Sequence, residues 1–125
     1  MLFDTDVLVW LLRGNARAAR VVEGSAEALI SIVSYMELLR GARDRSEARW
    51  VKAILADSGF LVMPLTENIG HRAAVYVEEY YRRAALEVTD ALIAATAVET
   101  GHTLCTANRK HYAMIADLEI ELFRP

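Results

Sequence analysis

The feature that most constrains the fold is the regular alternation of short apolar runs with longer segments that have helical periodicity. The short runs have the length of buried strands. They are residues 1–3, 28–32, 60–63, 103–105 and 119–123. The predicted helices are residues 7–12, 16–23, 35–40, 46–58, 67–84 and 90–100, with a helical turn at 109–114. Because alternating strands and helices require crossover connections, the sequence predicts an α/β protein, a three-layer α/β/α sandwich with a mostly parallel central sheet.

The size of the chain limits how many domains it can hold. A length of 125 residues fits one compact domain, residues 1–125. Hydrophobic residues make up 54% of the chain, which is enough apolar surface to form a core and excludes a disordered tail protein. Gly41, Gly59 and Gly101 follow predicted helices and are expected to end them in the left-handed conformation.

Cysteine usage and hydropathy indicate the compartment. Cys105 is the lone cysteine, so no internal disulfide is expected, and no paired Cys/His spacing indicates a structural zinc site. No apolar run approaches the roughly 18 residues of a membrane span. We therefore expect a cytoplasmic protein with no membrane association.

The net charge of −3 argues against a protein that holds nucleic acid by bulk electrostatics, because such domains are usually strongly basic. The basic residues are nevertheless unevenly distributed. They form three groups: Arg40, Arg43, Arg45, Arg49 and Lys52; Arg82 and Arg83; Arg109, Lys110 and His111. The sequence thus allows a local basic rim around an acidic site.

Acidic side chains stand where predicted strands give way to helices. Asp4 and Asp6 follow the first strand, with Thr5 between them, and ligands of open α/β sheets bind at this carboxyl edge. The structural alternative is that one of these side chains caps the first helix. The sequence by itself leaves both roles open.

Two further acids follow the same pattern. Glu37 lies in the short helix after the second strand, and its spacing from Ser34 is also that of a capping box. Asp90 opens an apolar helix, where a carboxylate is favoured by the helix dipole by about 0.3–1 kcal/mol. Glu87 is the weaker candidate and is expected to be a solvated loop charge.

A polar turn follows the fourth predicted strand. It carries Thr106, Asn108 and three side chains that can bear positive charge, and its structural alternative is a hydroxyl or Asx turn. Independent caps would not need to converge on one edge of a sheet, whereas carboxylates that do converge repel each other and are best tolerated around a hard divalent cation. This inventory of oxygen ligands predicts a Mg²⁺ or Mn²⁺ site. His71, His102 and His111 show no zinc-ligand spacing and are expected in surface or loop positions.

These motifs together resemble PIN-domain nucleases, and most closely the VapC-type toxins. The motifs that carry the resemblance are Phe3-Asp-Thr-Asp6, Ser34-Tyr-Met-Glu-Leu-Leu-Arg-Gly41, Thr89-Asp-Ala-Leu-Ile-Ala-Ala95 and Thr106-Ala-Asn-Arg-Lys-His-Tyr112. The match covers nearly the whole chain in the family's order and spacing. It implies a Mg²⁺- or Mn²⁺-dependent endoribonuclease, a homodimer, and inhibition by a small cognate antitoxin.

The resemblance also assigns roles to individual positions. Asp4, Glu37 and Asp90 match the acidic metal ligands of the family, and Asn108 stands at a further catalytic position where many relatives have aspartate. Supporting roles fall to Thr5, Asp6 and Thr106. The expected contacts to the RNA backbone are Arg40, Arg43, Arg109 and Lys110. A neutral amide at position 108 weakens the electrostatic holding of a second cation.

An apolar stripe in the predicted helix 67–84 indicates a core face. Its members are Ile69, Ala73, Val77, Tyr80 and Ala84. Tyr76, Tyr81 and Trp50 extend the apolar character beyond this stripe and are candidates for a dimer or antitoxin groove.

Two alternative functions remain open at this point. In the first, the motif Asp4-Thr-Asp6 would begin a haloacid-dehalogenase-like phosphatase, although the second acidic pair of that family has no counterpart after the fourth strand. In the second, the chain would be a non-catalytic RNA-binding or corepressor module, because the fourth acid is absent.

Overall fold

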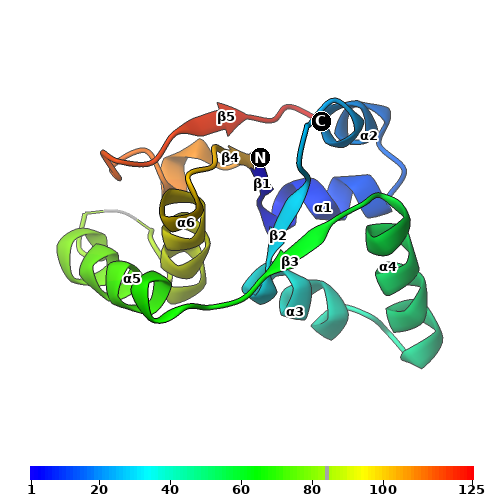
Figure 1. Ribbon diagram of the computed structural model, residues 1–125, viewed down its shortest axis with the longest axis horizontal. Coiled ribbons are helices and arrows are strands. Elements are labelled where there is room, and N and C mark those ends of the chain that lie inside the picture. The colour runs from blue at the N-terminus through cyan, green and yellow to red at the C-terminus, as the bar shows by residue number, and fades with distance from the viewer. Residues whose placement is uncertain (84) are drawn as a thin grey trace.

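The computed structural model describes residues 1–83 and 85–125. Its elements are β1 (Leu2–Phe3), α1 (Thr5–Leu12), α2 (Ala16–Glu23), β2 (Leu29–Ser31), α3 (Ile32–Arg40), α4 (Arg45–Asp57), β3 (Leu61–Met63), α5 (Glu67–Tyr80), α6 (Val88–Thr100), β4 (Leu104–Thr106), the 3₁₀ turn η1 (Arg109–His111) and β5 (Ile120–Leu122) (Figure 1). Among these described residues, no helix is long and apolar enough to cross a membrane.

The five strands form one sheet in the order β3-β2-β1-β4-β5, and every neighbouring pair is parallel. The chain builds outward from the central strand β1 through β2 to β3 and then returns to the other side of β1 with β4 and β5. The strand order therefore reverses between β1 and β4, and this is where an open α/β sheet offers a ligand crevice beyond its carboxyl ends. The structure confirms the predicted parallel α/β/α fold.

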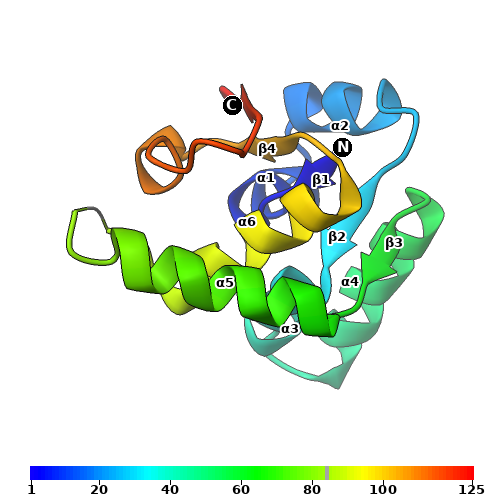
Figure 2. The same ribbon diagram turned by 60° about the vertical axis from the view of Figure 1, so that its left-hand side comes forward.

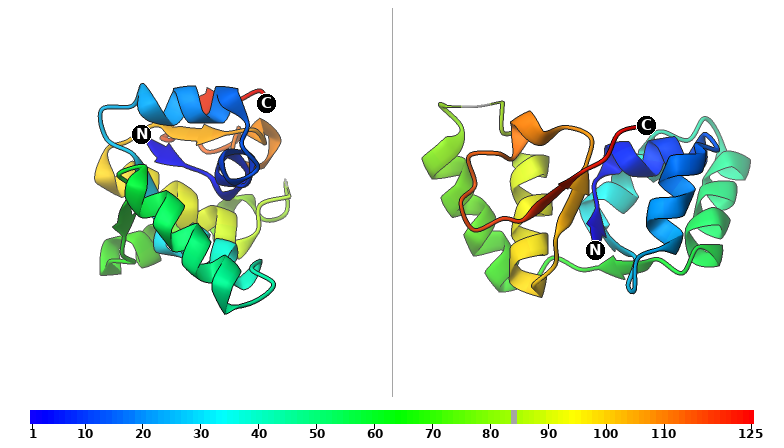
Figure 3. Two further views of the ribbon diagram at one scale, coloured as in Figure 1. Left: turned by 90° about the vertical axis from the view of Figure 1, so that its right-hand side faces the viewer. Right: turned by 90° about the horizontal axis from the view of Figure 1, so that it is seen from above.

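Side chains alternate between the two faces of the sheet. Leu2, Leu29 and Leu104 point into a core shared with α5 and α6. Phe3, Ile30 and Cys105 occupy the next positions of the same strands and point into a second core with α1, α2 and α4. Viewed from above, α5 and α6 lie on one side of the strands and α1, α2 and α4 on the other (Figure 3). Burial of both faces explains why β1, β2 and β4 are nearly continuous apolar runs, whereas in the edge strand β3 the apolar side chains of Leu61 and Val62 remain exposed.

Several predicted boundaries shift because helices begin directly at the ends of strands. The helix predicted at 7–12 begins at Thr5, and the helix predicted at 35–40 begins at Ile32. Each is capped by the last polar residue before it, Asp4 for α1 and Ser31 for α3, so the chain passes from strand to helix without a loop. Of the helix predicted at 67–84, α5 ends at Tyr80, and Ala84 lies outside the described residues.

The predicted glycine caps are confirmed at two positions and wrong at one. Gly59 and Gly101 have φ angles of 77° and 72°, in the left-handed region that favours glycine. Gly41, however, has φ of −73°, because its backbone N–H still bonds the Glu37 carbonyl as a continuation of the right-handed helix.

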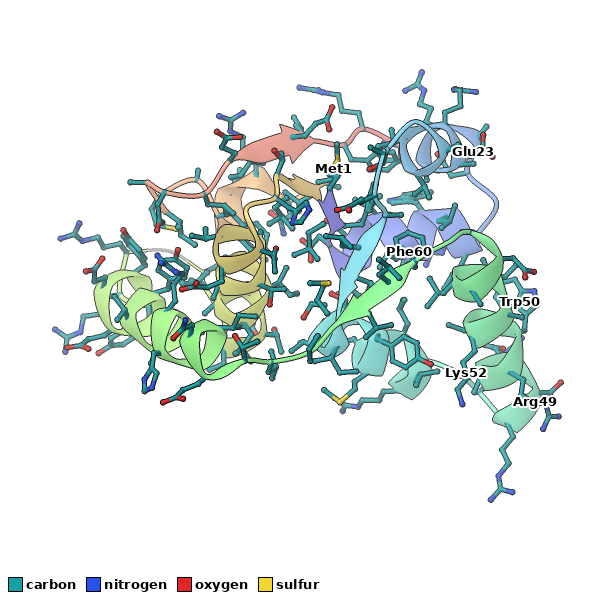
Figure 4. All side chains as sticks on the ribbon, viewed as in Figure 1. Met1, Glu23, Arg49, Trp50, Lys52 and Phe60 are labelled. Carbon is teal, nitrogen blue, oxygen red and sulfur yellow. The ribbon has the colours of Figure 1, made fainter. Side chains whose placement is uncertain are left out.

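The helix α5 packs against α6, and Figure 2 shows it crossing in front of that helix. Ile69 and Ala73 are buried there, as the apolar stripe predicted. The expectation that Tyr76 is available to a partner is wrong, because its side chain is only 4% exposed and its hydroxyl donates to Asp117 at 2.9 Å. Trp50 is 47% exposed, and Figure 4 shows it with Arg49 on the outer side of α4.

Candidate active site

Asp4 lies at the point where the strand order reverses. It follows β1 directly, and Thr106 ends the neighbouring strand β4. The Asp4 carboxylate is buried, accepting a hydrogen bond from the Thr5 backbone N–H at 2.8 Å and another from the Thr106 hydroxyl at 2.8 Å. Asp4 is thus the N-cap of α1 and also a buried carboxylate at the ligand edge, so the two roles considered from the sequence coexist.

Asp6 brings a second carboxylate to the same place. Its Oδ2 accepts from the Ala107 backbone N–H at 3.1 Å and lies 3.5 Å from the Thr106 hydroxyl. Its Oδ1 is buried, and within the described part of the chain it has no hydrogen-bond partner. A buried oxygen without a partner is costly unless a water or an ion satisfies it.

Glu37 is joined to this cluster through Thr5. The Thr5 hydroxyl donates to Glu37 Oε1 at 2.8 Å and lies 2.9 Å from the hydroxyl of Ser34. Glu37 itself is exposed, so its carboxylate faces solvent at the edge where Asp4 is buried.

The capping-box alternative for Ser34 and Glu37 is wrong. The N-cap of α3 is Ser31, whose hydroxyl accepts from the Val33 backbone N–H at 3.1 Å. Since α3 begins three residues earlier than predicted, Ser34 and Glu37 lie inside the helix and turn towards Thr5. Their side chains are thereby free for the site.

Asp90 enters from the first turn of α6. Its Oδ2 accepts from the Glu87 backbone N–H at 3.2 Å, so the predicted capping role exists, and Glu87 is the exposed N-cap of α6. The other carboxylate oxygen of Asp90 accepts from the Tyr112 hydroxyl at 3.3 Å. Nδ1 of His111 lies 3.3 Å from Asp90 Oδ2.

Asn108, the residue before η1, and His111 at the end of η1 bring two more polar side chains to the site. The Asn108 side-chain nitrogen lies 3.0 Å from Nε2 of His111, and its backbone N–H bonds the Thr106 hydroxyl at 3.0 Å. His111 and Tyr112 are the functional candidates that the sequence did not single out. The available signal was their position in the polar turn after β4, three and four residues beyond Asn108.

The four basic residues that the sequence predicts as RNA contacts divide into two groups. Arg109 and Lys110 are exposed in η1, next to the residues that contact Asp90, and Arg40 is exposed in the last turn of α3, which also carries Glu37. Arg43 lies two residues before α4 and pairs with Glu47 at 2.7 Å, although its side chain remains 87% exposed.

The site is electrostatically unfavourable for its own carboxylates. Burial, followed by the nearby charge of Asp6, raises the pKa of Asp4 from its ordinary value of 3.8 to about 6, against the hydrogen bonds from Thr106 and Thr5. Burial likewise raises the pKa of Asp6. Burial and the charges of Asp4 and Asp90 raise the pKa of Tyr112. A cation bound here would relieve this cost.

The residues present suit a hard divalent cation held partly through water. The donors are carboxylate and hydroxyl oxygens, and the partnerless buried oxygen of Asp6 is one of them. Residues 1–83 and 85–125 contain no group of three His, Cys, Asp or Glu side chains close enough to hold a metal ion together. Mg²⁺ commonly uses only one or two carboxylates and keeps several waters, so the chemistry of this donor set fits it.

The fold and the acidic edge together define a class of protein: a parallel α/β/α domain with buried carboxylates where its strand order reverses. The family model for the PIN domain matches residues 1–116, and the chain belongs to this family. The assignment leaves the haloacid-dehalogenase-like alternative without support.

Relatives and solved structures agree with this assignment. The chain is 37% identical over 123 residues to Ribonuclease VapC10 of Mycobacterium tuberculosis, covering 95% of this chain and 90% of that protein. It is 29% identical to Ribonuclease VapC1 of Rickettsia felis, covering 96% and 93% of the two chains. A toxin–antitoxin complex from Klebsiella pneumoniae contains a chain with 30% identity and a TM-score of 0.77, over 94% of this chain and 93% of that one. VapBC2 from Rickettsia felis, bound to a DNA fragment, shares the fold with a TM-score of 0.82 over 98% of both chains at 18% identity.

Proposed function

We propose that this chain is a Mg²⁺- or Mn²⁺-dependent endoribonuclease that hydrolyses RNA phosphodiester bonds and acts as the toxin of a type II toxin–antitoxin pair. The observation that carries the proposal is the hydrogen-bonded network at the edge of the sheet. Through Thr5 it joins Asp4 to Glu37, and beside Asp4 lies the Tyr112 hydroxyl, which donates to Asp90. The names of the relatives support ribonuclease activity for this site.

Asp4, Glu37 and Asp90 are the proposed metal-holding residues, with Asp6 in support. Since no three such side chains of residues 1–83 and 85–125 are close enough to contact one ion together, we propose that part of this set holds it through water. Bound there, the divalent ion would supply charge neutralisation for the phosphate and activate a water for attack on phosphorus. Neighbouring residues of the protein orient these carboxylates. The Thr5 backbone N–H and the Thr106 hydroxyl fix both oxygens of Asp4, while the Thr5 side chain directs Glu37.

Substrate charge is accommodated by the exposed cations beside the acids. We propose that Arg109 and Lys110 contact RNA phosphates, because both are exposed in η1 next to Asn108. Arg40 and Arg43 have the same role further from the buried carboxylates, with the Arg43 charge partly offset by Glu47. Such backbone contacts position the strand without determining its sequence.

The proposed metal dependence is tested by cleavage of a labelled RNA by the purified chain. We expect cleavage with Mg²⁺ or Mn²⁺ and its loss when EDTA is added, because the acidic edge repels phosphate until a cation offsets its charge. Restoring Mn²⁺ in excess over EDTA should restore cleavage. An equal rate in EDTA would contradict the metal dependence, whereas binding of RNA without any cleavage at saturating Mn²⁺ would favour the non-catalytic alternative.

We also propose a cytoplasmic homodimer that is inhibited by a small cognate antitoxin. The named toxin–antitoxin complex from Klebsiella pneumoniae supports an antitoxin partner. Large apolar side chains that remain exposed, among them Met36 at 52% and Leu61 at 59%, support a second contact surface. Analytical ultracentrifugation at micromolar concentration should give the mass of a dimer, and a monomer there would remove the dimer from the proposal.

A further inference from the structure

Tyr112 connects the hydrophobic core to the acidic edge. Its side chain is 0% exposed and packs in the core formed with α5 and α6. Only its hydroxyl is polar, and that group donates to Asp90 Oδ1 at 3.3 Å and lies near enough to Asp4 for the charge of that carboxylate to raise the pKa of the phenol. The ring is therefore fixed by packing, and the hydroxyl lies beside two carboxylates from distant parts of the chain.

The one hydrogen bond that the geometry defines for the Tyr112 hydroxyl goes to Asp90. A phenol has one proton to donate, and an O–H···O bond usually measures about 2.7–2.8 Å. The 3.3 Å distance to Asp90 is longer, so this contact leaves the Asp90 carboxylate room to adjust to a bound ion. Because each carboxylate has about four lone-pair sites, a contact with Tyr112 leaves others free for a cation.

We propose that Tyr112 is a positioning residue that sets the separation and orientation of the Asp4 and Asp90 carboxylates for one divalent ion. This inference rests on the metal-dependent function proposed above. Without the hydroxyl, the two carboxylates repel each other with no donor between them. A phenylalanine fills nearly the same volume, so the change from Tyr to Phe isolates the hydroxyl from the packing of the ring.

The test is calorimetric titration of the metal-free full chain with Mn²⁺, comparing the unmodified protein with Tyr112→Phe. Hydrogen-bond partners that orient metal ligands are typically worth 10–100-fold in metal affinity. We expect the Kd for Mn²⁺ to rise by about that factor. Circular dichroism at the titration temperature verifies that each variant is folded.

Tyr76→Phe is the matched control. Tyr76 is also a buried tyrosine that donates to an aspartate, but it lies in α5 and its hydrogen-bond acceptor, Asp117, is not one of the carboxylates of the site. This variant should lower the Tm while leaving the Kd for Mn²⁺ unchanged. A merely structural role for Tyr112 would give the same result as the control.

A double substitution tests whether the effect passes through the carboxylates. In an Asp90→Asn background, Tyr112→Phe should cost clearly less Mn²⁺ affinity than it costs alone, because one of the two positioned ligands is already lost. Unchanged or tighter Mn²⁺ binding by folded Tyr112→Phe would overturn the positioning role and leave the proposed function intact. Failure of the unmodified protein to bind Mn²⁺ would instead overturn the metal-dependent function itself, and the positioning role with it.

Discussion

Replacing Asp4 by asparagine is expected to reduce metal-dependent RNA cleavage by about three orders of magnitude. Asp4 is the most buried carboxylate of the site and follows β1 at the point where the strand order reverses between β1 and β4. Asparagine keeps the shape and one carbonyl oxygen but removes the charge that holds the cation. Metal ions supply several kcal/mol of transition-state stabilisation, and each 1.4 kcal/mol corresponds to about a factor of ten in rate.

The measurement is the initial rate of cleavage of a labelled RNA at saturating Mn²⁺. Asp57→Asn is the matched control, because it removes an exposed carboxylate at the end of α4 and should leave the rate unchanged. Circular dichroism must show that Asp4→Asn is folded. A folded Asp4→Asn protein that cleaves at the unmodified rate would remove Asp4 from the catalytic site.

The same substitution is expected to stabilise the metal-free protein at neutral and alkaline pH. In the folded chain the pKa of Asp4 is raised to about 6 from 3.8 by burial and by Asp6. Ionising Asp4 in the folded state therefore costs about 3 kcal/mol at pH values above 6, and asparagine avoids this cost. We expect the free energy of unfolding at pH 8 to increase by up to about 3 kcal/mol.

The raised pKa of Asp4 determines how its contribution to the free energy of unfolding changes with pH. Between pH 6 and 3.8 the folded protein takes up the Asp4 proton before the unfolded chain does, so this group makes the protein more stable as the pH falls. The advantage of Asp4→Asn should thus be present at pH 8 and disappear below about pH 4. Urea denaturation in EDTA at both pH values measures it, with Asp57→Asn as the control. Equal free energies of unfolding for Asp4→Asn and the unmodified protein at pH 8 would show that burial does not make ionisation of Asp4 costly.

Much of the fold could be predicted from local patterns. The strands are apolar on both faces and the helices are longer and periodic, so their alternation was sufficient to predict a parallel α/β/α sandwich. Element boundaries were less certain where strand and helix join without a loop. The Ser31 cap shows the reason: the sequence contains two serines three residues apart, and either can begin the helix.

The sequence predicted only part of the site, because local patterns place residues at the ends of elements but do not show which side chains meet. Asp4 and Asp90 stand at the ends of predicted elements, and parallel strands bring their carboxyl ends to one edge. His111 and Tyr112 were missed because a histidine or a tyrosine in a turn has many roles, and nothing in the neighbouring sequence indicates the carboxylate that each contacts. Tyr76 was placed on the wrong side of its helix because Asp117, its partner, is 41 residues away.

By itself, the sequence determined the order of strands and helices and which acids follow them, because these depend on periodicity and caps within a few residues. The tertiary structure alone decided which side chains meet. The Thr106 hydroxyl reaches Asp4 across 102 residues, and Tyr112 reaches Asp90 across 22. Such contacts exist only because β4 pairs with β1 and α6 packs against the sheet, so they follow from the long-range arrangement of the chain and not from any local pattern.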